Sequence, residues 1–99
     1  MITEAPKGDL VVSTCILSNR HGEPPVIGWA TYRQDGAVLS RVKSVKLPTR
    51  PTRQEAERDL LVWLTRRVFL TGTAAERLAL YPAYLRMQAA VRTQKEATP

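Results

Sequence analysis

The chain of 99 residues, 43% of them hydrophobic, is long enough for one domain with a single core. Its 15 Lys and Arg exceed its 9 Asp and Glu, and the net charge of +6 favours a nucleic acid or an acidic protein as partner. One Cys and one His argue against a metal site, and no apolar run reaches the ~20 residues that span a membrane.

The first strand is predicted at residues 10–18, which are β-branched and apolar and too few for a stable helix. Residues 1–8 before it are polar and include proline and glycine, so we expect a flexible tail. Cys15 in the strand has no second cysteine to pair with, which fits a cytoplasmic protein. Residues 19–25 contain two prolines and predict a loop.

A β-hairpin is predicted from the next two strands. Residues 26–34 have the composition of a strand. The dipeptide Asp35-Gly36 then favours a tight turn, because Gly accepts the positive φ that such turns require. Residues 38–47 are predicted to form the third strand, antiparallel to the second.

The alternation of apolar residues slips within this third strand. A one-residue bulge near Lys43-Ser44 would return its apolar residues to one face of the sheet. Those residues are Val38, Val42, Val45 and Leu47. The same bulge would align three cations on the opposite face, namely Arg41, Lys43 and Lys46.

A helix is predicted after a loop at residues 48–51, whose two prolines cannot continue a strand ladder. Thr52 and Glu55 form a capping box, and the helix is expected to run to about Leu70. Its apolar stripe consists of Ala56, Leu60, Leu61, Leu64 and Val68. Val62 and Phe69 lie outside the stripe, so this helix needs a second cover or presents an interaction face.

The second cover is expected to be a last helix, which begins at a capping box of Thr73 and Glu76 and runs to about Thr93. Pro82 inside it predicts a kink or a restart. Residues 94–99 are polar and are expected to form a second flexible tail. These elements predict an α+β fold in one domain: a three-stranded antiparallel β-meander followed by two C-terminal α-helices.

The chain offers few groups for catalysis. His21 is the only imidazole and falls in the predicted loop, and there is no Gly-rich phosphate loop. We therefore expect no enzymatic activity, no metal and no cofactor. Glu57 falls inside the apolar stripe of the first helix, where a carboxylate is costly unless it is paired. It is either salt-bridged to a neighbour such as Arg53 or a remnant of a catalytic carboxylate.

Four short segments carry a resemblance to a known family. They are Gly28-Trp29-Ala30, Asp35-Gly36-Ala37-Val38-Leu39, Leu47-Pro48 and Thr52-Arg53-Gln54-Glu55-Ala56-Glu57. Together they resemble the opening half of the ribonuclease H fold over about residues 10–70. The resemblance implies that Glu57 matches the family's catalytic helix glutamate. The first strand offers Ser13-Thr14 in place of a metal-binding Asp, and the family's fourth and fifth strands have no counterpart, so a catalytically degenerate form is implied.

The HicB-type antitoxins resemble the same plan of three strands and one helix. They are non-enzymes that bind a toxin partner. The helix segment Val62-Trp63-Leu64 is similar to theirs. This resemblance implies a protein-interaction module, such as an antitoxin-like or phage- or plasmid-encoded regulator. The apolar residues outside the helix stripe, Val62 and Phe69, are its predicted interaction face, and an exposed face of this kind favours a homodimer.

The cations of the third strand and the following loop predict a binding surface for RNA or DNA through the phosphate backbone. Tyr32 on the second strand could stack on a base or simply pack. The predicted nucleic-acid-binding residues are Tyr32, Arg33, Arg41, Lys43, Lys46, Arg50 and Arg53. A solvated outer sheet face is the alternative interpretation of the same cations. Arg66, Arg67 and Arg77 could extend the surface or lie far from it.

Overall fold

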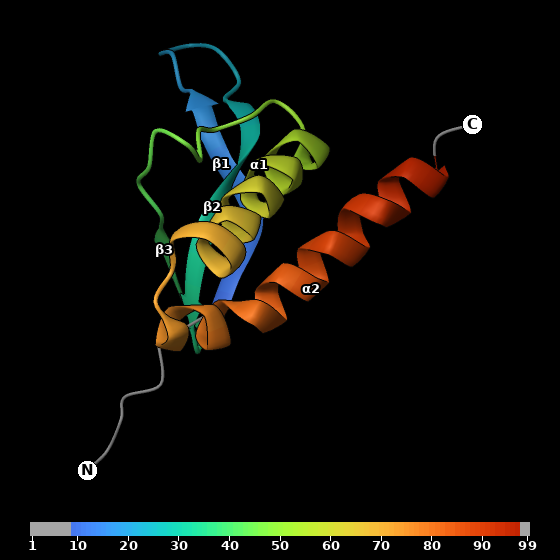
Figure 1. Cartoon of the computed structure of the whole chain (residues 1–99). Coiled ribbons are helices and arrows are strands. Elements are labelled where there is room, and N and C mark those ends of the chain that lie inside the picture. Colours follow the sequence, from blue (N-terminus) through green and yellow to red (C-terminus); the bar gives the residue numbers. More distant parts are fainter. Residues whose placement is uncertain (1–8, 98–99) are drawn as a thin grey trace.

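The computed structural model describes residues 9–97, with side chains through Gln94. Its elements are β1 (Asp9–Ser18), β2 (Val26–Asp35), β3 (Val38–Arg41), α1 (Arg53–Arg66), the π-helical η1 (Arg67–Thr71) and α2 (Ala74–Ala97). The strands form one antiparallel sheet in the order β1-β2-β3, and the helices follow (Figure 1). The predicted α+β class and the order of its elements are therefore confirmed.

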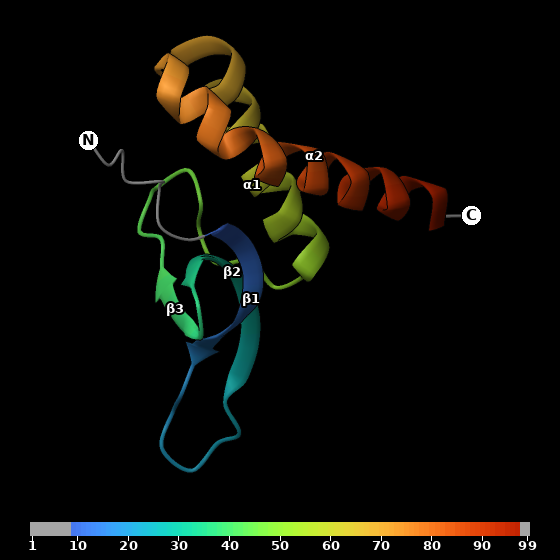
Figure 2. The ribbon, with the colours of Figure 1, turned by 90° about the horizontal axis from the view of Figure 1, so that it is seen from below.

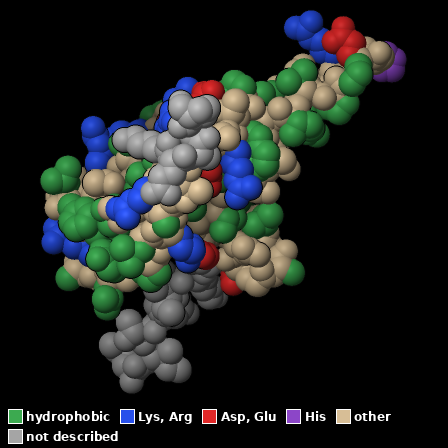
Figure 3. Space-filling model, turned by 90° about the vertical axis from the view of Figure 1, so that its right-hand side faces the viewer, with side chains coloured by type: hydrophobic (Ala, Val, Ile, Leu, Met, Phe, Trp, Pro, Cys, Tyr) green, Lys and Arg blue, Asp and Glu red, His purple; other side chains and the backbone are tan. Residues whose placement is uncertain are grey.

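The predicted hairpin between β2 and β3 is present, but Asp35 still pairs with Val38, so the two turn residues are Gly36 and Ala37. Gly36 takes the positive φ of 62° that such a turn requires. The longer hairpin of β1 and β2 projects from the body, and its tip carries His21, the only histidine of the chain (Figure 3). In this part of the chain Ile16 and Ile27 face each other across the strands and remain more than half exposed. The tip is thus an arm outside the core.

The third strand is shorter than predicted, and the predicted bulge is wrong. β3 ends at Arg41, Val42 makes one more ladder bond to Thr31, and the chain then leaves the sheet. It returns at Arg50, which exchanges two backbone hydrogen bonds of 2.8 Å with Trp29. The segment between them, residues 43–49, loops out over the helix side of the sheet.

Burial explains this departure. Leu47 within the looped segment is 1% exposed and belongs to the hydrophobic core, whereas Val45 is 94% exposed and Val38 is 62% exposed. The apolar residues of the predicted third strand therefore do not share one face. The chain gives up ladder hydrogen bonds and places Leu47 between the sheet and α1 instead.

The two helices pack on one face of the sheet, and the core lies between the sheet and these helices (Figure 2). Its buried members are Leu10, Leu47, Leu60, Leu64 and Ala83. Leu60 and Leu64 come from the predicted stripe of α1, and α2 covers the other side of that helix. The ion pair of Arg86 with Asp9 also joins α2 to the start of β1.

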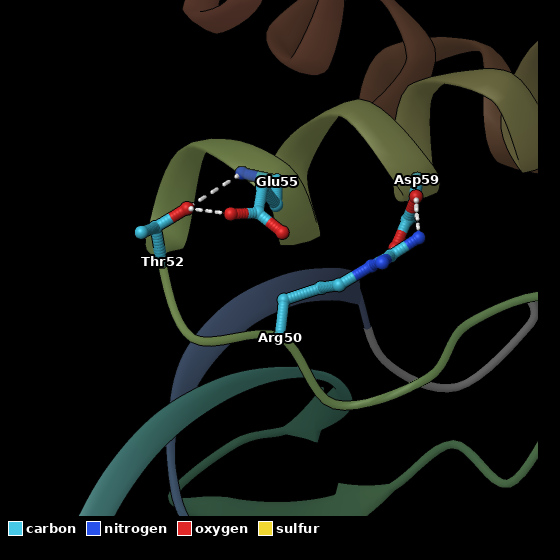
Figure 4. Close-up of polar contacts among 4 residues, drawn as sticks. All are labelled: Arg50, Thr52, Glu55 and Asp59. Carbon is cyan, nitrogen blue, oxygen red and sulfur yellow. Dashed lines mark hydrogen bonds and ion pairs between the residues drawn. The ribbon is translucent and has the colours of Figure 1, made fainter.

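The predicted capping box of α1 is confirmed (Figure 4). The Glu55 N–H donates to the Thr52 hydroxyl at 3.3 Å, and that hydroxyl donates to the Glu55 carboxylate at 3.1 Å. At α2 the Glu76 N–H donates to the Thr73 hydroxyl at 3.2 Å, while the Glu76 carboxylate pairs with Arg67. Short-range sequence signals therefore set both helix starts.

α1 continues into η1, and Gly72 ends the run with an N–H that donates to the Arg67 carbonyl at 2.8 Å. α2 is continuous through Pro82, so of the two predicted alternatives the restart is excluded, and Figure 2 shows the helix axis bending near its first turns. α2 extends past Thr93 to Ala97. Residues 1–8 and 98–99 of the predicted tails lie outside the described residues. Within residues 9–97, no helix has the length and apolar character needed to cross a bilayer.

Candidate functional site

Two adjoining hollows lie between the looped segment and the C-terminal half of α1, with volumes of about 300 and 370 Å³. They share three residues: Lys46, Trp63 and Arg66. The first hollow is completed by Asp59 and Val62. The second is completed by Ser44, Val45, Arg67 and Thr71. We call the two together the basic groove.

The helix side of the basic groove is built on Trp63. Arg66 and Arg67 follow at i+3 and i+4, which places all three side chains on the same face of the helix. The Arg67 guanidinium lies over the Trp63 ring, 5.0 Å from its centroid, as a cation–π pair. The indole is half-buried against the core, so the ring holds a cation at a fixed place.

The loop side of the basic groove is held by a tight turn. The Leu47 N–H donates to the Ser44 carbonyl at 3.1 Å, and the Lys46 N–H donates to the Ser44 hydroxyl at 3.2 Å. Because the Leu47 side chain is buried in the core, the backbone of the neighbouring Lys46 is held in place and its side chain starts from a fixed point. The core residue of the looped segment therefore positions the cation beside it.

The single acidic residue lining the basic groove, among the residues described, is already neutralised. Arg50 donates to both Asp59 oxygens, from Nε at 2.7 Å and from Nη2 at 3.3 Å (Figure 4). The side-chain hydrogen bond and the charge of Asp59 raise the pKa of the Arg50 guanidinium above its ordinary value. Arg50 thus stays charged and is committed to Asp59.

Arg53 is also committed to the fold. Its guanidinium lies over Trp29 at 5.6 Å and pairs with Glu57 at 3.7 Å. Glu57 is 7% exposed and also accepts a hydrogen bond of 2.9 Å from Gln94 of α2. The paired interpretation of this buried carboxylate is confirmed. It ties α1 to α2 rather than opening into the basic groove.

The predicted residues of the sheet lie elsewhere. Tyr32 and Arg41 are direct cross-strand partners, so they share one face, and the Tyr32 hydroxyl donates to the Thr14 carbonyl at 2.9 Å. Arg33 is opposite Ser40 and belongs to the other face. Lys43 is exposed in the looped segment. In Figure 3 the cations of the visible face are interspersed with apolar side chains. The run from Arg41 to Arg53 is not one patch.

The predicted interaction face is divided as well. Val62 is 57% exposed and lines the basic groove. Phe69 is 51% exposed and meets Tyr84 of α2 edge-on, with ring centroids 5.1 Å apart. The two residues therefore have different surroundings.

Sequence reasoning left Arg66 and Arg67 undecided, and the structure brings both to Lys46. The available signal was their spacing from Trp63 on one helix face. Arg77, the third undecided cation, does not join them, because its Nε donates to the Gly72 carbonyl at 3.1 Å. The sequence spacing could not show that Lys46 lies near Arg66 and Arg67, because its position depends on how the looped segment packs against α1.

The basic groove brings the side chains of Lys46 and Arg66 to the same hollows as the Trp63 indole. The Arg67 guanidinium lies on that ring and also pairs with Glu76 at 3.7 Å, and Asp59 is paired with Arg50. Residues 9–97 contain no group of three or more His, Cys, Asp or Glu that could hold a metal ion. Comparisons with family models, curated proteins and solved structures found no match to this chain.

Proposed function

We propose that this chain is a non-catalytic nucleic-acid-binding module that contacts the phosphate backbone through the basic groove. The observation that carries the proposal is that Lys46, Arg66 and Arg67 line the same hollows, with Arg67 lying on the ring of Trp63. Guanidinium and ammonium groups are the side chains that neutralise backbone phosphates, and each neutralised phosphate adds a salt-sensitive contribution to binding. Of the seven residues predicted from the sequence, Lys46 is the one that enters this site.

The remaining predicted cations support the site indirectly. Arg50 removes the repulsion that Asp59 would exert on a phosphate. The net charge of +6 favours approach of any polyanion from a distance. A cytoplasmic location belongs to the same proposal, because the lone Cys15 needs no oxidising compartment.

The proposal is tested by the salt dependence of binding to short RNA and DNA. In the double variant Lys46→Glu with Arg66→Glu we expect weaker binding at low salt. The slope of log affinity against log salt should fall by about 0.9 on duplex DNA, and by about 0.7 on single strands, for each phosphate that the variant no longer neutralises. The measurement is fluorescence anisotropy of a labelled oligonucleotide over a series of salt concentrations.

The matched control is Arg20→Glu with Arg92→Glu, which changes the net charge equally at two exposed positions outside the basic groove. It should leave the slope close to that of the wild type. Equal loss of affinity in both double variants would show attraction by net charge without a site, and no binding at low salt would remove the proposal.

A protein partner is the second candidate, since Val62 and Phe69 remain about half exposed. An antitoxin-like module of this kind would bind its partner through apolar contacts that salt does not weaken. Absence of nucleic-acid binding, together with a defined complex that persists at high salt, would favour this candidate over the first.

A further inference from the structure

The outer edge of β1 is the most unusual part of the surface. β1 is a terminal strand of the sheet with ten residues, Asp9–Ser18, and no described residue pairs with its outer side. Natural sheets blunt such edges with lysines, prolines or short strands. β1 is long, apolar and β-branched, and Asp9 at its start is its one charged residue. A strand of this kind is a template for another strand.

The pairing of β2 shows which backbone groups of β1 are free. Trp29 exchanges hydrogen bonds with Arg50 on the β3 side, so the backbone groups of its neighbours Gly28 and Ala30 face β1. Their partners in the register are Cys15 and Ser13, which therefore face β2. The alternate residues of β1 direct their N–H and C=O groups to the outer edge: Leu10, Val12, Thr14 and Ile16.

Two side-chain hydrogen bonds agree with this assignment. The Leu10 N–H donates to the Asp9 carboxylate at 2.9 Å, and the Thr14 carbonyl accepts from the Tyr32 hydroxyl at 2.9 Å. Both backbone groups face outward, and each forms its hydrogen bond with a side chain because no neighbouring strand is there to supply a backbone partner. Both outward groups of Val12 and Ile16 have no such side-chain partner among the described residues.

We infer that a second copy of this chain pairs with β1 in antiparallel orientation, so that two sheets become one sheet of six strands. Regular pairing of β1 with β2 ends at a register shift between Ile16 and Ser18. The outward-facing stretch therefore runs from Leu10 to Ile16, and Ser13 is its midpoint. A two-fold axis at Ser13 lets the same stretch serve both copies.

This register matches the side chains. It sets Leu10, which is 2% exposed, opposite Ile16 of the second copy, which is 58% exposed in one chain alone. Val12 then faces Thr14, and Val11 faces Cys15, so the ladder contains no like-charge pair. The exposed Ile16 would gain the apolar neighbours that its own chain does not supply.

The helices favour the same arrangement. The two-fold axis stands perpendicular to the joined sheet, so both copies carry their helices on one face. In Figures 1 and 2 the C-terminal half of α2 projects past β1, in the direction in which a second copy would extend the sheet. Each projecting helix would then lie over the partner's side of the sheet.

The first test is sedimentation equilibrium of the wild type and of Thr14→Pro. The Thr14 N–H faces outward, so proline there removes a hydrogen bond to the second copy and leaves the β1–β2 ladder intact. We expect a dimer for the wild type and for the control Thr14→Ala, and a monomer with an unchanged circular dichroism spectrum for Thr14→Pro. A monomeric wild type, or a dimeric and folded Thr14→Pro, would overturn the inference.

The second test holds even if the proline variant fails to fold. Ser13 lies on the axis in a non-hydrogen-bonded pair, where Cα atoms about 4.5 Å apart allow a disulfide. Ser13→Cys in a Cys15→Ser background should become a covalent dimer under mild oxidation. In this register Cys15 faces Val11 of the second copy, four residues away from that copy's Cys15. The two natural cysteines are therefore too far apart to pair, and the wild type should stay uncrosslinked. Crosslinking through Cys15, or none at residue 13, contradicts this register.

Discussion

Leu47 shows at the scale of one residue how the core positions the basic groove. Its side chain fills the space between the sheet and α1, and Lys46 beside it faces the groove. The sequence contained both residues, and Lys46 was predicted as a cation of the binding surface. Parity alone could not show that Leu47 leaves the strand, because burial between two elements is decided by their packing and not by local alternation.

The first prediction contrasts two apolar residues of the same looped segment. Leu47→Ala should lower the free energy of unfolding by about 2–5 kcal/mol, because it opens a cavity in the core. Val45→Ala should change it by less than about 0.5 kcal/mol, since Val45 is almost fully exposed. Urea unfolding followed by circular dichroism gives both values. Similar losses of stability in the two variants would contradict the looped path of this segment.

Arg67 gives the second prediction at this scale. Arg67→Lys keeps the charge but loses the planar group that lies on Trp63. We expect weaker nucleic-acid binding with the salt slope nearly unchanged, because the number of cations is the same. Anisotropy titrations of the variant and of Arg92→Lys, an exposed control on α2, measure the difference. If Arg67→Lys binds with the same affinity as the control, the guanidinium on Trp63 does not contribute to binding.

At the scale of elements, the predictable parts are those with short-range causes. The hairpin turn at Gly36 and the caps at Thr52 and Thr73 each depend on groups within three residues, and all three are present, with the turn one residue later than predicted. The end of β3 was missed, and the sequence left open whether α2 would kink or restart at Pro82. Both depend on contacts between distant segments, which no local pattern reports.

Gly72 marks the boundary between the two helical elements and gives the third prediction. A Cβ at this position would overlap the Arg67 carbonyl oxygen that accepts the Gly72 N–H. Gly72→Ala should therefore destabilise the fold by about 1–3 kcal/mol through overpacking. Thr71→Ala at the exposed neighbouring position should cost less than about 0.5 kcal/mol. Equal midpoints in thermal unfolding would show that the end of η1 can relax around a methyl group.

At the scale of the whole molecule, the positive charge is unevenly distributed, because several cations form ion pairs within the fold. Arg50, Arg53 and Arg86 pair with acidic residues, and the pair of Arg86 with Asp9 joins α2 to the sheet. Arg67 is used in the same way, because it lies on Trp63 and 3.7 Å from Glu76, so Lys46 and Arg66 are the cations that the basic groove offers to a ligand. The total charge was evident from composition, but the distribution required the fold.

The two tryptophans allow the most direct measurement of the central claim. Trp63 forms the floor of the basic groove, whereas Trp29 lies beneath Arg53 at the other end of α1. In a nitrogen-15 correlation spectrum each indole N–H gives its own signal. On addition of a short oligonucleotide at low salt, the account predicts a shift of the Trp63 signal and little change at Trp29. A shift at Trp29 alone, or none at either ring, would contradict it.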